Sequence, residues 1–292
     1  MKKVLFSVAL ALVFGMNLGM ITAQAQSFDV GIKGGLNIPN LKSGGENSPL
    51  SEGFSSLLAW GSGIVVEKHV TKTFSIQTGI EYSLQGGKKD GVQAIPAGPV
   101  YEEAQVADAE FAMMKIYMPE EYLYADFYSE PRFHYLMLPV QAKFGRNISV
   151  TSPLRVYLSG GIFGSYLLKG ERITKRSSGL YADAKSTSLR DFATPLVVDM
   201  IPFLRDKILA GLDMFGNEIN DFNGTDIITD DVYRFNFGVI GSLGVSCKLA
   251  TRHSIFIEGG GNYGLIKIQK DKANGQNRIG AVTAMLGYSF LL

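Results

Sequence analysis

Histidine is the side chain best suited to acid–base or metal chemistry near neutral pH, and the sequence holds three of them. His69 and His253 fall in predicted short turns, whereas His134 falls at the opposite end of a predicted strand. A metal site or an activated nucleophile needs such groups within bonding distance of one another. We therefore predict no catalytic residue, no metal site and no enzyme. One hydrolytic alternative stays open, in which His134 acts with Asp126 or Glu130.

A glycine motif offers a second chemical possibility. The stretch GGGNYG matches the dinucleotide pattern G-x-G-x-x-G through Gly259, Gly261 and Gly264. That pattern binds a pyrophosphate only where a helix begins, because the amides at the helix N-terminus face the phosphates. Here the following residues, LIKIQK, keep the alternation of a strand. We predict no cofactor, and we expect the glycines to relieve crowding inside a sheet.

The elements around these residues read as strands with one apolar face. In TFSIQTGIEYSLQGG, residues 73–87, every second side chain is apolar or threonine from Phe74 to Leu84, and the alternate face is mostly polar. Strands of soluble sandwiches are shorter, usually about five or six residues. A membrane barrel needs about nine to eleven residues per tilted strand, with apolar side chains toward lipid and polar side chains toward the lumen.

Eight stretches follow this rule. They cover residues 28–36, 55–68, 73–87, 134–145, 154–169, 233–249, 253–268 and 278–292. Short and long connections alternate between them, and the longest are residues 86–132 and 170–231. Membrane barrels have short periplasmic turns, long extracellular loops and an even number of strands. We predict an all-β fold: an eight-stranded antiparallel transmembrane β-barrel with long, partly helical extracellular loops. A soluble sandwich is the alternative.

The N-terminus predicts export. Lys2 and Lys3 precede an apolar run that ends in Ala23-Gln24-Ala25, the pattern that a signal peptidase cleaves. We predict a signal peptide over residues 1–25 and a barrel domain over residues 26–292; a retained membrane helix is the alternative. Without the two lysines, 26 basic residues face 27 acidic ones, so no nucleic-acid partner is expected. Cys247 is the sole cysteine, which excludes an intramolecular disulfide.

Charged residues on the polar faces would lie inside the barrel. An eight-stranded barrel is just wide enough for side chains to fill, so we expect a packed lumen. Buried charges are costly unless they are paired. Both signs are present, and we predict a lumenal ion-pair network of Lys33, Glu81, Lys143, Arg155, Arg234 and Glu258.

The long loops carry a helical pattern. Apolar residues recur at helical spacing between residues 197 and 215, and Pro202 can begin or kink the helix. We predict a cap over the barrel mouth in which Leu204, Ile208 and Leu212 face the barrel or the neighbouring loop. The alternative is that this stripe contacts a partner protein or a ligand. The acids of both long loops are expected to point outward.

With the strands placed, the chain resembles the PorT-type outer-membrane β-barrel family. The likeness lies in FDVGIKGGLN, HYLMLPVQAKFG, YLSGGIFGSYLL, FIEGGGNYGL and the ending LGYSFLL. It implies localisation in the cell outer membrane, contact with outer-membrane lipid, and insertion by the barrel-assembly machinery. The C-terminal signal of that machinery is matched in part by Gly287, Phe290 and Leu292, where leucine replaces the terminal aromatic residue.

The most consistent function is an integral outer-membrane barrel with a filled lumen and a structural or binding role. An extracellular or envelope protein would be its partner through the long loops. Two other functions stay open: an enzyme at the rim, and a small pore or secretion-associated barrel.

Overall fold

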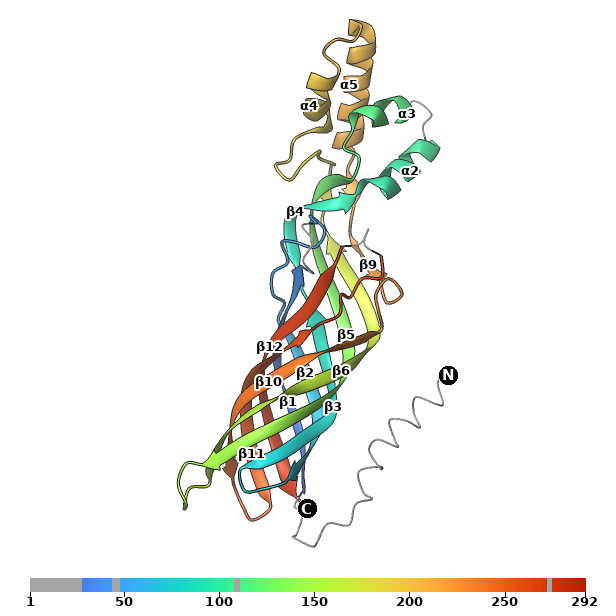
Figure 1. Cartoon of the computed structure of the whole chain (residues 1–292). Helices are drawn as coiled ribbons and strands as arrows, with labels where there is room; N and C mark the ends of the chain where they lie inside the picture. Colours follow the sequence, from blue (N-terminus) through green and yellow to red (C-terminus); the bar gives the residue numbers. More distant parts are fainter. Residues whose placement is uncertain (1–27, 44–47, 108–110, 272–274) are drawn as a thin grey trace, which may run out of the picture.

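The computed structural model describes residues 28–43, 48–107, 111–271 and 275–292, so the predicted signal peptide, residues 1–25, lies outside the described residues. Eight long strands form an elongated barrel (Figure 1). Their bounds are β1 Phe28–Ser43, β2 Ala59–His69, β3 Phe74–Gly86, β5 Tyr122–Asn147, β6 Leu154–Lys175, β10 Phe235–Lys248, β11 His253–Gly264 and β12 Asn277–Leu291.

The barrel is closed by hydrogen bonds between neighbouring antiparallel strands. Strand β1 pairs with both β2 and β12, which joins the first strand to the last. Strands β5 and β6 complete the ring, and their register shifts between His134 and Tyr135. A closed ring leaves every strand paired, which is the condition for crossing a bilayer with strands. The prediction of eight antiparallel strands is confirmed.

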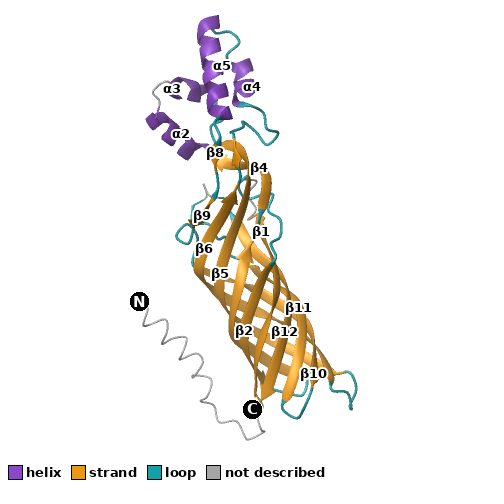
Figure 2. Cartoon of the chain, turned by 180° about the vertical axis from the view of Figure 1, so that it is seen from behind, coloured by secondary structure: helices purple, strands orange, loops and turns teal. Residues whose placement is uncertain are grey.

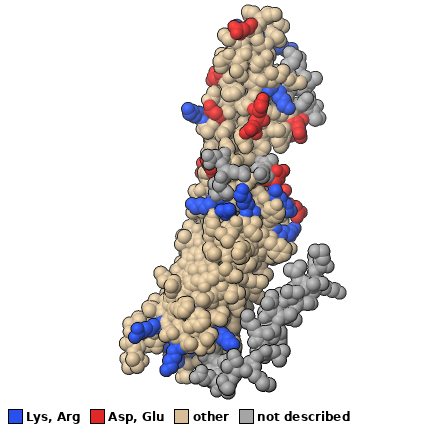
Figure 3. Space-filling model, in the orientation of Figure 1, with Lys and Arg blue, Asp and Glu red and all other residues tan. Residues whose placement is uncertain are grey.

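Side chains alternate across the barrel wall as the sequence predicts. Outward-facing residues in the middle of the strands, such as Ile64, Leu243 and Leu286, are more than half exposed on the isolated chain. On the face that Figure 3 shows, the middle of the barrel is an uncharged band between two charged zones. Aromatic pairs border this band: Trp60 with Tyr82 on one side, and Phe74 with Phe144 on the other. Such girdles mark the two membrane interfaces of barrels.

Two strands continue well beyond the band, into residues 86–132 and 170–231, which the sequence pattern predicted to be long, partly helical loops. Strand β5 begins at Tyr122, and β4 (Lys89–Pro96) pairs with its first half. Strand β6 runs to Lys175 and pairs with β9 (Gly224–Ile227). The short pair β7 (Ser177–Ser178) and β8 (Asn220–Asp221) follows.

A small helical head stands at the end of these extended strands (Figures 1 and 2). It contains α2 (Ala97–Ala107), α3 (Phe111–Met114), η2 (Lys115–Tyr117), α4 (Leu189–Ala193), η3 (Thr194–Leu196) and α5 (Pro202–Asn217). Helix α5 covers most of the predicted stripe and begins at the predicted proline. Among the described helices, none is long and apolar enough to cross a bilayer.

The orientation follows from the connections. The turns between β2 and β3, β5 and β6, and β10 and β11 are short, and they lie at the same end of the barrel as the C-terminus (Figure 2). The helical head lies at the opposite end. Since membrane barrels have short periplasmic turns and long outer loops, the head is on the extracellular side.

Candidate functional site

Six charged side chains form a chain of alternating sign along the inner wall of the barrel. Lys33 Nζ lies 2.8 Å from Glu81 Oε1 and 3.8 Å from Glu258 Oε2. Lys143 Nζ lies 4.0 Å from Glu258 Oε1 and 2.8 Å from Glu67 Oε2. Arg155 Nη1 continues the chain, at 3.7 Å from Glu67 Oε1. Three positive and three negative charges alternate, so neighbouring groups compensate each other.

Polar neighbours complete this chain. The Tyr157 hydroxyl donates to Glu258 Oε1 at 3.0 Å, and the Ser75 hydroxyl donates to Glu67 Oε1 at 2.5 Å. Lys143 Nζ also donates to Gln77 Oε1 at 3.1 Å and lies over the Tyr157 ring, 3.9 Å from its centroid. Buried charges need such additional hydrogen bonds, because Coulomb attraction alone does not repay their dehydration.

The structure corrects one predicted member of the network and adds another. Arg234 precedes β10 at the extracellular end and pairs with Asp230 at 2.9 Å, away from the lumenal chain. Glu67 takes a central place instead, because it contacts both Lys143 and Arg155. The period-two pattern placed Glu67 on the polar face. Glu67 and Lys143 meet because their strands are staggered so that the two residues lie at the same height, and the sequence does not show this stagger.

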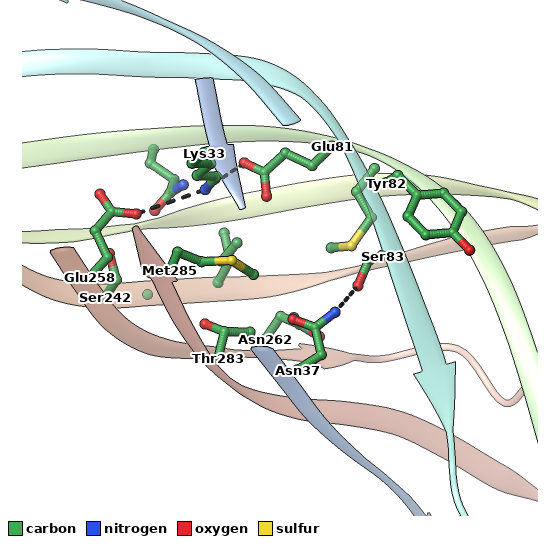
Figure 4. Close-up of a pocket in the computed structure, with 14 residues that line it drawn as sticks. Lys33, Asn37, Glu81, Tyr82, Ser83, Ser242, Glu258, Asn262, Thr283 and Met285 are labelled. Atoms are coloured by element: carbon green, nitrogen blue, oxygen red, sulfur yellow. Dashed lines mark hydrogen bonds and ion pairs between the residues drawn. The ribbon is translucent and has the colours of Figure 1, made fainter. Parts of the chain in front are cut away.

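A small cavity of about 30 Å³ lies beside the chain at the middle of the lumen (Figure 4). Lys33, Glu81, Asn37 and Ser83 border it, and the Asn37 amide donates to the Ser83 hydroxyl at 2.9 Å. The buried Asn37 Oδ1 has no hydrogen-bond partner among the described residues. A polar cavity of this size holds about one or two water molecules. It has room for water and is too small for an organic ligand.

The extracellular half of the lumen contains a buried apolar cluster beside its polar side chains, which differs from the predicted polar filling. Phe133, Tyr135, Phe163 and Leu167 are buried there in one cluster. Ile268, from the connection between β11 and β12, packs into the same cluster. Side chains from the wall and from the outer connections therefore close this mouth of the barrel, and the helical head stands farther out.

The three histidines lie apart, as predicted. His69 Nε2 contacts Asp29 Oδ2 at 3.1 Å, and His253 Nδ1 contacts the Tyr288 hydroxyl at 2.5 Å. His134 lies between the Tyr82 hydroxyl, at 2.6 Å, and Glu171 Oε1, at 3.5 Å. Within the described ranges, no group of three or more histidine, cysteine or acidic side chains is placed to hold a metal ion.

The acids proposed as partners of His134 are engaged elsewhere. Asp126 Oδ1 accepts a hydrogen bond from Arg176 Nη1 at 2.5 Å. Glu130 pairs with Arg132 and accepts a hydrogen bond from Tyr128. The structure therefore does not assemble the hydrolytic arrangement of His134 with either acid.

The helical head has a hydrophobic core of its own. Leu212 and Val197 are fully buried in it, Ile208 is nearly so, and Leu204 packs against it. The same core contains Tyr101 and Met118 from the other long connection and Leu123, Ala125 and Phe127 from the tip of β5. Leu204, Ile208 and Leu212 thus face the neighbouring connection and the tip of β5.

Lys89 anchors the connection between β1 and β2 to the base of the head. Its ammonium donates to the carbonyls of Pro49 and Leu50 at 3.2 and 2.9 Å and lies over the Phe54 ring. Burial lowers the pKa of this lysine from 10.5 to about 8.

The proposed C-terminal assembly residues lie on and just after β12. Gly287 faces inward, and a side chain there would overlap the Phe256 ring, at 2.1 Å. Phe290 pairs across to Val30 of β1 and His253 of β11. The amide of Leu292 donates to the carbonyl of Phe28 at 2.8 Å. The role of these three residues in assembly stays a prediction.

Solved structures of outer-membrane barrels are similar to this chain at low identity. Neisserial surface protein A is 10% identical, with 89% of this chain and 95% of that chain covered and a TM-score of 0.35. A major outer membrane protein from Thermus thermophilus is 9% identical, with 92% and 100% covered and a TM-score of 0.39. The outer membrane protease OmpT from Escherichia coli is 8% identical, with 94% and 99% covered and a TM-score of 0.40. No curated protein matches the chain in sequence.

A family model settles the relationship, because it matches most of the chain. The model describes the outer membrane protein beta-barrel domain and matches residues 23–270. The closed eight-stranded ring and the uncharged outer band agree with it. The protein is located in the outer membrane, and the chain belongs to the outer membrane protein beta-barrel domain family.

Proposed function

We propose that the protein is a non-catalytic membrane anchor that displays its helical head at the cell surface to bind another protein. The observation that carries this proposal is the apolar surface of the head. Ile201 and Phe203 each expose more than seven-tenths of their surface, and Leu196 and Val198 more than half. Leu196, Val198 and Ile201 lie in the connection between α4 and α5, and Phe203 lies in the first turn of α5. This end of α5 is the part of the head farthest from the barrel (Figure 1).

The head does not need these side chains for its own stability. Val197, Met200 and Leu204 from the same stretch turn inward to its core, so the exposed residues alternate with residues that already fix the fold. Large apolar side chains grouped on a surface mark protein contact sites, and aromatic anchors carry much of the binding energy at such sites.

The barrel supports a role as an anchor. The lumenal ion-pair chain and the apolar cluster around Phe133 and Tyr135 fill the interior. The separation of His134 from Asp126 and Glu130 supports the absence of catalysis at the rim. The PorT-type resemblance of the strands fits the same proposal, and we do not assign a role in secretion from it.

Site-specific photo-crosslinking on intact cells tests the proposal. A photoreactive residue in place of Phe203 should give one dominant protein adduct. The same residue in place of Lys185, which is exposed elsewhere on the head, is the matched control and should give none. Equal labelling at both positions, or no protein adduct at position 203, would contradict a protein-binding role for this surface.

A further inference from the structure

The periplasmic end of the barrel contains a second, larger cavity. It has a volume of about 460 Å³ and opens between the short turns. We call it the periplasmic vestibule. This volume lies within the range of small-molecule sites, roughly 300–1,000 Å³. The vestibule is on the opposite side of the membrane from the helical head, so the proposed function above does not involve it.

The walls of the vestibule are predominantly basic. Two acidic residues, Asp29 and Glu67, line it together with five basic residues: Lys72, Lys143, Arg155, Lys248 and Arg252. Both acids already have partners, because Asp29 contacts His69 at 3.1 Å and Glu67 contacts Lys143 at 2.8 Å. A cleft lined by one sign of charge concentrates ligands of the opposite sign.

Among the residues that the structure describes, Arg155 is the only side chain with two buried polar atoms that lack a hydrogen-bond partner. These atoms are Nε and Nη2, and the one ion pair that Arg155 makes with the described part of the chain runs through Nη1 to Glu67 at 3.7 Å. Buried charged donors without acceptors are costly. A guanidinium presents its donors as a planar fork that matches the two oxygens of a carboxylate or phosphate. One oxyanion would therefore supply the acceptors that this residue lacks.

The rim of the vestibule adds cations that the fold does not use. Lys248 and Arg252 are exposed at its edge, and no ion pair joins either of them to a carboxylate of the described chain. We propose that the periplasmic vestibule is a binding site for a small periplasmic molecule carrying a carboxylate or phosphate group. Arg155 binds the oxyanion at the base, and Lys248 and Arg252 attract it at the rim.

Calorimetric titration of the full-length protein in detergent micelles tests this site. Inorganic phosphate and N-acetyl-diglycine are the two probes, and chloride keeps the ionic strength constant. At least one probe should bind saturably, and the stronger probe identifies the source of the oxyanion. Arg155→Gln should weaken that binding about tenfold or more, the loss expected for one charge-assisted hydrogen bond.

Two further variants keep the result interpretable. Arg146→Gln removes one positive charge from an exposed residue at the same end, outside the vestibule, and should leave binding unchanged. The double variant Lys248→Gln/Arg252→Gln leaves the buried network intact and should weaken binding several-fold even if Arg155→Gln fails to fold. The proposal is wrong if neither probe binds saturably, or if Arg146→Gln weakens binding as much as the vestibule variants do.

Discussion

Replacing Lys143 with methionine should destabilise the barrel more than breaking an exposed ion pair does. The lysine ammonium lies 2.8 Å from Glu67 and 4.0 Å from Glu258, and all three side chains are at least nine-tenths buried. Methionine preserves most of the side-chain volume and removes only the charge. Two buried carboxylates then lose their shared cation, and breaking a buried pair in this way costs about 3–5 kcal/mol.

The double variant Lys143→Met/Glu67→Gln separates the charge effect from packing. It removes both ends of the 2.8 Å pair between Lys143 and Glu67, and replacing a whole buried ion pair by neutral groups of similar volume is often close to neutral. We therefore expect the double variant to recover only part of the lost stability, because Arg155 loses its contact with Glu67 and Glu258 keeps only Lys33 as a cationic neighbour. Arg172→Met is the control: it breaks the exposed pair with Asp226, at 3.0 Å, and should cost less than about 1 kcal/mol.

Urea-induced unfolding from lipid vesicles, followed by heat-modifiable migration on a gel, measures these differences. The expected order of unfolding midpoints is wild type, then Arg172→Met, then the double variant, with Lys143→Met lowest. A Lys143→Met midpoint equal to that of Arg172→Met would refute the lumenal network as a stabilising element. A double variant as unstable as the single one would assign the loss to packing instead of charge.

Three further predictions concern the lipid face, the head and its base. Leu243→Arg, in the middle of the apolar band, should lower the free energy of unfolding by about 2–4 kcal/mol. Phe235→Arg, near the interface, should lower it by at most about 1 kcal/mol. Equal losses in vesicle unfolding would contradict the assigned membrane position. Leu212→Ala should destabilise the head by about 2–5 kcal/mol and admit protease there, while the barrel stays heat-modifiable; loss of heat-modifiability would mean that the two parts fold together. Because burial lowers the pKa of Lys89 from 10.5 to about 8, the unfolded chain binds more protons between these values, so stability should rise as pH increases from about 8 to 10.5. Thermal unfolding of wild type and Lys89→Met across this range checks it, and an unchanged pH dependence in the variant would count against the assignment.

The membrane part of the fold was predictable because lipid imposes a simple rule on each strand: every second side chain faces lipid and is apolar. Leu136, Leu138 and Val140 face outward on β5, and Met137 and Gln141 face inward, as the period-two pattern predicted. The eight strands follow from that rule alone.

Beyond the membrane, the apolar face of a strand is buried and the polar face is exposed. On the outer part of β5, Leu123, Ala125 and Phe127 are buried in the core of the head, and Tyr124 and Asp126 lie on the opposite face. A search for apolar faces next to lipid therefore reads this segment as a loop. The sequence pattern also predicted Arg234 as a member of the lumenal network and omitted Glu67. It could not do better, because the stagger between strands decides which charges meet.

The account depends most on the claim that the lumen is sealed. A sealed barrel acts as an anchor, whereas an open one acts as a channel. Trp60, the single tryptophan, lies on the outer face near one interface, so quenching by brominated lipid first verifies that refolded protein has inserted. Ion conductance of the same preparation in planar bilayers is then the most direct test. We predict no conductance steps above the lipid background, because the ion-pair chain and the cluster around Phe133 fill the lumen. Stable, protein-dependent conductance steps in the wild type would contradict this account.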